Sequence, residues 1–413
     1  MTMPYYTDPD AWQRLYVGPL SPYIDTFAQR LLEQGYAQPT SRTKLNLVAT
    51  LSEWLQRHRL GVETLDEQRI NAFLHDLFQR QGHAYRGAPA TLGALLEQLR
   101  QSGVIAAPPA VIDTSALAQL ERDFAQYLAQ ERGLATATVV NYVPFIRCFL
   151  TERFGHRPLG LDQLRVADVS GFVLRHAPTL SPGRAKLLVT ALRSFFRFLR
   201  QRGDLELDLA AAVPTVANWR LATLPRFLEP LQVERLLQSC DQCTAVGQRD
   251  YTVLLLLARL GLRAGEVVHL CLDDFDWDAG LLTVRGKGGR SGRLPLPADV
   301  GEAVVTYLRY GRPRCATRRV FVRMQAPRVG FASSVAICSI LRRALKRAGL
   351  EPTFKGSHLL RHSLATQLLR NGASLAQIGE LLRHRLPHTT EIYAKVDQAA
   401  LSALAQPWPG GAS

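Results

Sequence analysis

The sequence predicts a mainly α-helical protein with a small antiparallel sheet, divided into several domains. The chain has 413 residues, which corresponds to about two to four domains of ordinary size. Apolar residues recur at helical spacing through most of it, as at Leu45, Val48, Leu51 and Leu55. A single short region, Leu281 to Leu296, has the pattern of a hairpin around a glycine-rich turn. These three observations set the fold class.

Composition places the chain among globular proteins that work in a reducing compartment. Apolar residues make up 47% and charged residues 21%, so real hydrophobic cores can form. The longest apolar stretches, such as 251–258, are far shorter than the roughly 20 residues that span a bilayer, and the first residues do not resemble a signal peptide. The six cysteines are scattered, which favours a cytoplasmic setting without disulfides. Cys240 and Cys243 form one CxxC in a segment expected to be helical, and no second pair stands at zinc-ribbon spacing, so ordinary cysteines are favoured over a metal or redox site.

Two helical blocks come first. Residues 1–106 form an all-helical N-terminal domain, and residues 107–212 form a second one after a proline turn. Helices of the second block are expected near 120–129, 138–154, 166–174 and 181–201. Short matches between the blocks, such as Phe27-Ala-Gln with Phe124-Ala-Gln and Gly35 with Gly133, suggest a duplicated module. Chance similarity between short helices is the alternative.

A linker and a third domain complete the chain. Pro214, Pro225 and Pro230 interrupt any helix, so residues 213–228 are expected to be an extended linker. The third domain, residues 229–405, begins with helices near 232–239 and 249–260, continues through the hairpin and ends in further helices, and residues 406–413 are a tail.

Positive charge increases along the chain. The formal net charge is +15 and the pI is about 9.9. Basic residues exceed acidic ones by 0 in residues 1–106, by 5 in 107–227 and by 10 in 228–413. A polyanion such as DNA is the natural partner of this excess, although solubility alone would also explain it. Only six of the 50 basic residues are lysines, so a lysine in a special position is informative.

The first two motifs of the third domain offer cations. In Gly261-Leu-Arg263-Ala-Gly-Glu266, Arg263 is expected near a helix N-terminus, where it either grips a phosphate or pairs with Glu266 on the surface. The turn Arg285-Gly-Lys287-Gly-Gly-Arg290 carries Lys287, which can act as a general acid. A solvated basic loop is the alternative, and the turn does not follow the P-loop pattern.

The other two motifs add histidines, a second arginine and a tyrosine. His358 and Arg361 are spaced i, i+3, so both can reach one phosphate. The HxxxH spacings at 358/362 and 384/388 lack the glutamate of zinc peptidases, so a metal site is disfavoured. Tyr393 is either a packed aromatic or a nucleophile whose transition state fixed cations stabilise in place of Mg²⁺.

This order of residues resembles the tyrosine recombinases, also called phage integrases. The segment HLLRHSLATQLLRNGASLAQIGELLRH, followed by TTEIYAKV, is similar to their C-terminal signature, and the likeness extends over about residues 107–405. The resemblance implies that Tyr393 forms a 3′-phosphotyrosyl bond to DNA, that Arg263, Arg361 and His358 hold the scissile phosphate, and that His384 hydrogen-bonds it. Lys287 would protonate the 5′-oxygen leaving group, and Glu266 would support the site.

The resemblance also implies an architecture and partners. Residues 107–212 would be the SAM-like core-binding domain, which closes a clamp on double-stranded DNA with the catalytic domain. A homotetramer on DNA is implied, with the segment after Tyr393 docking on a neighbouring protomer or packing on its own domain, and partner recombinases stay possible. No cofactor or metal is expected. The candidate DNA-contacting residues are Arg184, Lys186, Arg193, Arg197, Arg290 and Arg385.

One departure and three rival functions are open at this point. The family's common Leu-Gly-His is Leu382-Arg383-His384 here, which alters the local turn or adds a phosphate contact. The ending is most similar to recombinases of transposable elements, so we expect a site-specific recombinase that acts through a Holliday junction without metal or ATP. The rivals are a topoisomerase of the same chemistry, a DNA-binding regulator and a metal-dependent nuclease.

Overall fold

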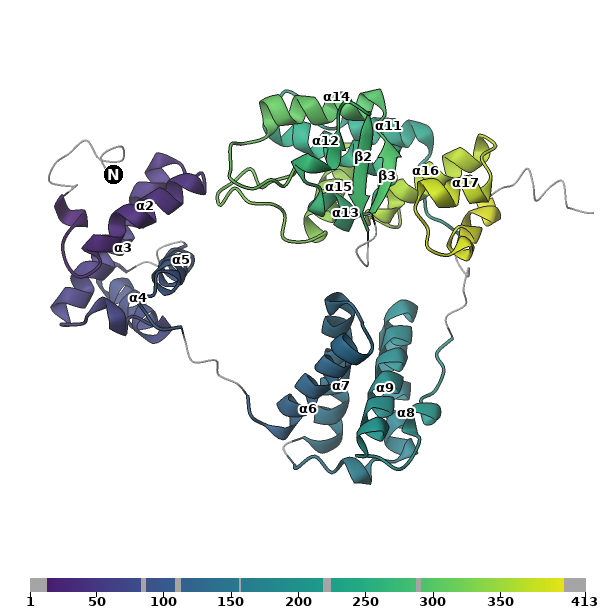
Figure 1. Ribbon diagram of the computed structural model, residues 1–413, viewed down its shortest axis with the longest axis horizontal. Coiled ribbons are helices and arrows are strands. Elements are labelled where there is room, and N and C mark those ends of the chain that lie inside the picture. Colours follow the sequence, from purple (N-terminus) through teal and green to yellow (C-terminus); the bar gives the residue numbers. More distant parts are fainter. Residues whose placement is uncertain are drawn as a thin grey trace, which may run out of the picture. The chain divides into compact units, whose positions relative to one another are not determined.

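The predicted fold class is confirmed by the computed structural model, which is mostly helical with one small antiparallel sheet (Figure 1). The structure describes residues 13–82, 87–107, 113–155, 157–217, 224–286 and 291–396. Residues 109–223 form one compact unit, and the segments before and after it are grouped in the other. Three blocks of the chain, each with a hydrophobic core of its own, are described one at a time.

The N-terminal block is a bundle of amphipathic helices around a core that includes Phe27, Leu51, Phe73 and Leu95. Local signals set its helix ends. The Asp66 side chain caps one helix by accepting a hydrogen bond from the backbone N–H of Arg69, at 2.8 Å. The helices are α2 (Ile24–Glu33), α3 (Gln38–Arg57), α4 (Glu67–Gln81) and α5 (Ala88–Gln101).

The second block has an aromatic core. Phe149 meets both Phe172 and Phe196 edge to face, at centroid distances of 5.2 and 5.6 Å. Val213 is buried in the same core, so the packed chain reaches the first residue of the segment predicted to be a linker. The four expected helices are confirmed to within a few residues. The helices are α6 (Ala116–Gln126), α7 (Thr136–Phe154), α8 (Val166–His176), α9 (Pro182–Arg202) and α10 (Leu209–Ala212).

The order of elements in the two blocks supports the duplication hypothesis. In each block, a helix is followed by a long helix, a 3₁₀ turn (Val62–Thr64 or Leu161–Gln163) and further helices, which number two in the first block and three in the second. The long helices α3 and α7 have nearly the same length, 20 and 19 residues. The corresponding helices α5 and α9 differ in charge, because α9 carries six basic residues whereas Arg100 is the one basic residue of α5. The shared order therefore does not extend to a shared surface.

The third block surrounds α12 with other helices. Residues 253–257 of α12 are buried on every side because α11, α14, α15 and α16 all pack against this helix. The expected hairpin is confirmed, and Leu282 pairs with Leu294 on its buried face. The helices are α11 (Pro230–Gln238), α12 (Ala245–Arg259), α13 (Ala264–His269), α14 (Ala298–Thr306), α15 (Val335–Arg347), α16 (His358–Arg370) and α17 (Leu375–Leu381). The strands are β1 (Phe275–Asp276), β2 (Leu281–Arg285) and β3 (Ser291–Pro295), in the order β1-β2-β3.

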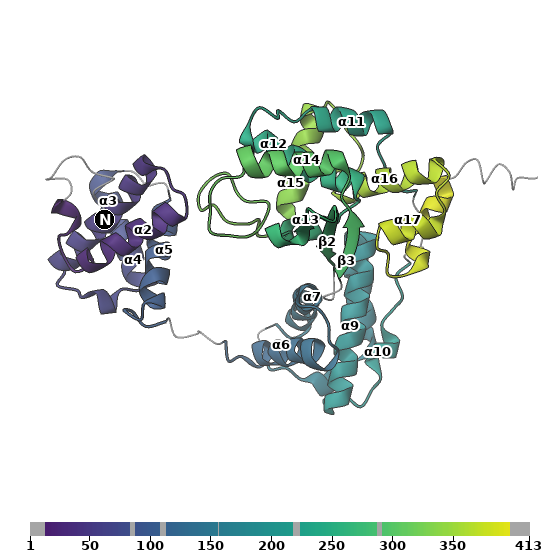
Figure 2. The same ribbon diagram turned by 45° about the horizontal axis from the view of Figure 1, so that its top comes forward.

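A small satellite core holds the C-terminal part of this block. Ala365 of α16, Ile378 of α17, Leu382 and Tyr393 are buried together. Tyr393 belongs to the 3₁₀ segment Glu391–Val396, which packs against both helices and is drawn with them in yellow (Figure 2). The last described residues are thus fastened to the helix that carries His358 and Arg361.

The cysteines of the chain are not cross-linked. All six cysteines have free thiols. The CxxC lies in the turn between α11 and α12, so the expectation that it is helical was wrong; α11 ends at Gln238, before Cys240. None of the helices in the described part of the chain is long and apolar enough to cross a bilayer.

Candidate active site

The break between α12 and α13 places the first arginine. Gly261 adopts φ +57°, and the chain then starts α13 with Arg263 as its N-cap residue. Glu266, three residues further on, accepts the Arg263 backbone N–H at 2.8 Å and its guanidinium Nη1 at 2.7 Å. The Glu266 side chain is only 4% exposed, so this is not the surface pair that was the alternative. The motif instead holds Arg263 on a buried carboxylate.

Glu266 stays ionised in this setting. Burial alone would raise its pKa, but the Arg263 N–H and the guanidinium groups of Arg383 and Arg263 outweigh burial and lower the pKa below its usual value. The Arg383 guanidinium donates to Glu266 Oε2 at 2.8 Å. Two arginines therefore share one buried carboxylate.

Backbone carbonyls hold the second arginine. Arg361 lies in the first turn of α16, is 3% exposed, and donates from Nη1 to the Gly261 carbonyl and from Nη2 to the Leu382 carbonyl. Burial, followed by the nearby charges of Arg263 and Arg383, lowers its pKa to about 10. Arg361 thus remains a cation at neutral pH, and its position connects the α12–α13 break with the end of α17.

The histidines beside these cations are neutral. Burial and then the positive charge of Arg361 lower the pKa of His358, and the same causes lower the pKa of His384 to about 4. His384 Nδ1 lies 2.7 Å from the Thr390 hydroxyl, which fixes its ring. A neutral imidazole can donate one hydrogen bond and accept another, so each ring suits a phosphate oxygen.

Tyr393 is enclosed. The residue is 1% exposed, and its hydroxyl lies 2.9 Å from Nδ1 of His362. Burial raises the pKa of Tyr393 to about 12, an effect that the charge of Arg361 partly offsets. Burial and the neighbouring His358 and Arg361 lower the pKa of His362 to about 4, so a neutral phenol faces a neutral imidazole. In this conformation Tyr393 is the packed aromatic of the first alternative, yet it lies beside Arg361.

The structure therefore gathers most of the predicted catalytic residues in one place. Arg263, Glu266, His358, Arg361, His384 and Tyr393 meet where the α12–α13 break, α16 and the end of α17 come together. Lys287 and Arg290 lie outside the described residues. The strands that lead to them end nearby, since a Cβ at Gly292 of β3 would lie 3.1 Å from the Arg383 side chain. Arg385 is exposed just beyond the site.

Two contacts of this site were not predicted from the sequence, although Arg383 was expected either to alter the local turn or to add a phosphate contact. His362 contacts the Tyr393 hydroxyl, and Arg383 contacts Glu266. The departure at Leu382-Arg383-His384 was the available signal for Arg383, whereas His362 carried none beyond its place in the motif. The contact between His362 and the Tyr393 hydroxyl forms only because the 3₁₀ segment Glu391–Val396 packs against α16.

Comparison with known proteins agrees with this geometry. Residues 226–400 match the family described as "Phage integrase family", and residues 122–203 match "Phage integrase, N-terminal SAM-like domain". The integrase/recombinase y4rA of Sinorhizobium fredii is 47% identical over 412 residues, which cover 99% of this chain and 100% of that protein. The tyrosine recombinase XerD of Listeria innocua is 32% identical over 284 residues, which cover 68% of this chain and 94% of XerD.

The chain belongs to the phage integrase family. Solved structures show the same fold at lower identity. The XerH site-specific recombinase bound to its difH substrate gives a TM-score of 0.53 at 20% identity, and covers 72% of this chain and 86% of XerH. A λ integrase fragment bound to a COC′ core site also gives 0.53, at 18% identity, and covers 70% of this chain and 97% of that fragment.

The predicted DNA-contacting residues of the SAM-like domain of this tyrosine recombinase differ in how they are held. Lys186 and Arg197 are exposed on α9. The Arg184 guanidinium stacks 4.9 Å from the ring centre of Phe145. Arg193 donates at 3.0 Å to both the Val213 carbonyl and the Thr215 hydroxyl, so it fastens the chain that follows α10. Their contact with DNA stays a prediction.

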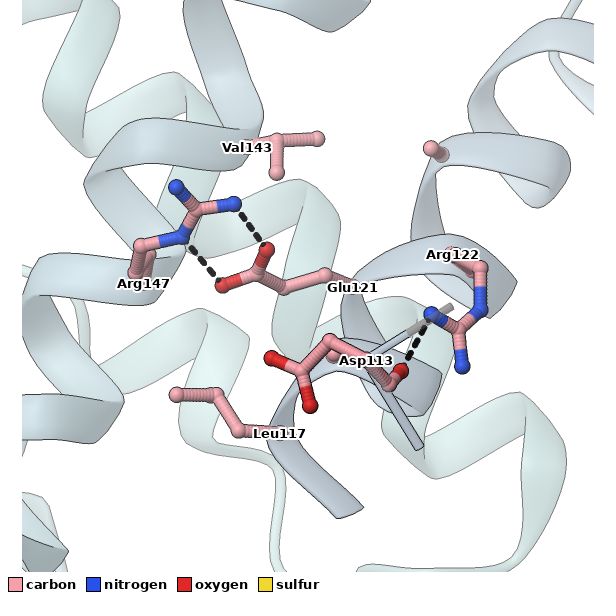
Figure 3. Close-up of a pocket in the computed structure, with 8 residues that line it drawn as sticks. Asp113, Leu117, Glu121, Arg122, Val143 and Arg147 are labelled. Atoms are coloured by element: carbon pink, nitrogen blue, oxygen red, sulfur yellow. Dashed lines mark hydrogen bonds and ion pairs between the residues drawn. The ribbon is translucent and has the colours of Figure 1, made fainter. Parts of the chain in front are cut away.

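A cavity of about 580 Å³ in the same domain carries none of the predicted catalytic residues (Figure 3). Its charged groups already have partners. Arg147 donates twice to the buried Glu121, and Arg122 donates to the Asp113 carbonyl at 2.7 Å.

Elsewhere in the described part of the domain, one set of three side chains has ligand atoms within 4.8 Å of one another, namely Cys148, Glu152 and His176. Glu152 there accepts hydrogen bonds from Arg175 and His176.

Proposed function

We propose that this tyrosine recombinase cuts and rejoins double-stranded DNA at specific sites through a 3′-phosphotyrosyl bond to Tyr393. The observation that carries the proposal is the placement of Tyr393 beside Arg361, with Arg263 joined to the same turn. A phosphodiester entering this region would meet two guanidinium groups and two neutral imidazoles. Family membership supports the reaction class, and the site geometry supports the assignment of residues.

The residues divide the work by chemistry. Arg263, Arg361 and His358 hold the non-bridging oxygens of the scissile phosphate, and His384 donates a further hydrogen bond. The Tyr393 oxygen attacks phosphorus, the bond to the 5′-oxygen breaks, and Lys287 gives that oxygen a proton. The phenol proton passes to water, because the hydrogen bond between the Tyr393 hydroxyl and Nδ1 of His362, 2.9 Å long in the packed conformation, is lost when Tyr393 moves to the phosphate.

We propose that the cycle needs neither metal nor ATP. The charge that develops on the phosphate is balanced by arginines already in place, and Glu266, the carboxylate among them, is held by two of these arginines. A transesterification keeps the energy of the phosphodiester in the phosphotyrosine, so religation needs no other source. Two such exchanges on paired sites pass through a Holliday junction.

The burial of Tyr393 implies a preceding movement. At 1% exposure, its hydroxyl cannot touch a phosphate while the segment Glu391–Val396 is packed as described. We infer that DNA binding draws this segment away from α16 and α17. A homotetramer on DNA, partner recombinases, a clamp formed with the SAM-like domain and carriage by a mobile element are further parts of the proposal.

The deciding experiment looks for a covalent adduct. The protein is incubated in EDTA with nicked DNA fragments from the flanks of its own gene and examined on a denaturing gel. We expect a protein–DNA adduct with the wild type, and no adduct with Tyr393→Phe although DNA still binds within a few-fold. Tyr307→Phe is the matched control, because Tyr307 is a buried tyrosine of the same block whose pKa burial also raises to about 12.

Other results would point to the rival functions. An adduct that persists in Tyr393→Phe would place the nucleophile elsewhere. DNA binding without any adduct would favour a regulator, and cleavage lost in EDTA would favour a nuclease. Relaxation of supercoils without a need for two sites would indicate a topoisomerase.

A further inference from the structure

Two arginines of this chain occupy the same position of the same helix-ending motif. After α3, the N–H of Arg59 bonds to the Gln56 carbonyl and that of Leu60 to Leu55. After α17, the N–H of Arg383 bonds to the Glu380 carbonyl and that of His384 to Gly379. Both patterns are Schellman motifs, in which the residue with positive φ is usually glycine. The φ angles are +55° at Arg59 and +53° at Arg383, so each arginine adopts a conformation that disfavours a side chain.

The two side chains have different surroundings. Arg59 is exposed. The Arg383 side chain is only 17% exposed, and it donates to Glu266 Oε2 at 2.8 Å and to the Leu381 carbonyl at 3.2 Å. The stem of Arg383 also passes close to Gly292 of β3, where a Cβ would lie 3.1 Å away. The strained backbone at Arg383 therefore supports a buried ion pair that Arg59 lacks.

The backbone of the same turn holds both phosphate-binding arginines. The Arg383 carbonyl accepts a hydrogen bond from Arg263 Nη2 at 3.3 Å, and the Leu382 carbonyl accepts one from Arg361. Arg263 and Arg383 share Glu266, so a closed ring of contacts runs from Arg263 through Glu266 and the Arg383 side chain to the Arg383 carbonyl and back to Arg263. A glycine at position 383 would leave this ring open.

We propose that Arg383 is a positioning residue for the strand-cleavage reaction. Its side chain anchors the turn on Glu266 and thereby sets the place from which Arg263 and Arg361 reach the scissile phosphate. Its guanidinium group also pairs with Glu266, so that carboxylate has a second cationic partner besides Arg263. The inference rests on the proposed function and adds to it a residue at the one position where the sequence departs from the family's pattern.

The test is a single-turnover measurement of adduct formation on nicked DNA, with saturating full-length protein. For Arg383→Gly we expect the rate constant to fall at least about tenfold, which corresponds to about 1.4 kcal/mol of activation free energy. The fraction of protein that reacts and the Kd for DNA should stay within about twofold, because glycine suits the backbone conformation. Arg383→Lys should recover part of the rate, since it restores a cation beside Glu266.

Two controls make the result specific. Arg59→Gly is the same substitution at the same motif position away from the site, and its rate constant should equal that of the wild type. The second control is the Glu266→Gln background, in which Arg383→Gly should cost less than in the wild type because the ion pair is already gone.

The possible outcomes distinguish failure of the inference about Arg383 from failure of the proposed recombinase function. An unchanged rate constant in Arg383→Gly would overturn the inference, as would a smaller reacting fraction with a normal rate constant, which would mean that Arg383 only supports folding. Absence of a Tyr393-dependent adduct in the wild type would overturn the proposed function and this inference together.

Discussion

At the scale of single residues, backbone carbonyls rather than carboxylates position the buried Arg361. A buried cation without partners is costly, and Arg361 satisfies this demand with the carbonyls of Gly261 and Leu382. A carboxylate in their place would neutralise the charge that a phosphate needs. Glu266, the buried carboxylate in the described part of the site, pairs with Arg263 and Arg383 instead.

Gly261 is the residue whose size matters most in this arrangement. Its φ is +57°, and a Cβ there would lie 2.6 Å from Cδ2 of Leu382. Gly261→Ala should cost about 1–3 kcal/mol of unfolding free energy beyond the backbone strain and should slow adduct formation, because it pushes the Leu382 turn away. Urea unfolding and the adduct assay measure the two effects.

Substitution of a second glycine, Gly280, distinguishes the cost of backbone strain from the cost of a steric clash. Gly280 has a similar φ of +63°, but nothing lies within 4 Å of the Cβ it would carry. Gly280→Ala should therefore show only the strain, about 1–2 kcal/mol, with unchanged adduct formation. Equal effects at Gly261 and Gly280 would mean that the contact with Leu382 is unimportant.

The buried histidines predict a dependence of stability on pH. The pKa of His362 and of His384 is about 4 in the folded protein, against about 6.5 for a free histidine. Between these two pKa values the unfolded chain binds protons that the folded chain does not bind. The free energy of unfolding should therefore fall as the pH drops from about 6.5 to 5. His362 alone contributes at most about 2 kcal/mol over this window.

Urea unfolding at several pH values tests this expectation. In His362→Gln the fall between pH 6.5 and 5 should be smaller than in the wild type, because a titrating group has been removed. Identical slopes for the two proteins would show that His362 is protonated as readily in the folded state as in the unfolded one.

At the scale of elements, apolar periodicity predicted the helices well because most of them bury one face around the core of their own block, and α12 is buried on every side. The hairpin was predictable for a similar reason, since Leu282 and Leu294 face the core from strands joined by a glycine-rich turn. The turn after α17 was not predictable in detail. Arginine is a poor residue for positive φ, and its compensation by Glu266 comes from a residue 117 positions away. The contact between His362 and Tyr393 was not predicted either, because it too joins residues that are far apart in the sequence.

Helix α9 allows a prediction for DNA binding. Arg197 is exposed, and we find no ion pair for it within the described residues, whereas Arg202 on the same helix pairs with Asp123 and Asp204 at 2.8 and 2.6 Å. Arg197→Ala should weaken DNA binding on every sequence and reduce the slope of log K against log salt by about one. Arg202→Ala is the control and should leave the slope unchanged. The same slope for Arg197→Ala and the wild type would exclude a phosphate contact.

At the scale of the whole molecule, the N-terminal block is separate in core and in charge. Among the described residues, the cores of the other two blocks begin at Leu117, and residues 1–106 have no net charge. We expect a chain without residues 1–106 to form the Tyr393-dependent adduct and to bind DNA within a few-fold of the full chain. Gel-shift and adduct assays on the two chains measure this. Loss of binding would show that the block contributes to the DNA contact despite its net charge of zero.

Enclosure of Tyr393 has a consequence for fidelity. A DNA-cutting protein meets far more irrelevant phosphodiesters than correct ones, and each encounter is an opportunity for damage. If Tyr393 is the nucleophile, as we propose, DNA binding must first supply the free energy that withdraws it from Ala365, Ile378 and Leu382. A weakly held stretch of DNA cannot supply that energy, whereas a well-matched site can. On the proposed function, the packing of Tyr393 would then set a threshold in binding free energy against accidental cleavage of DNA.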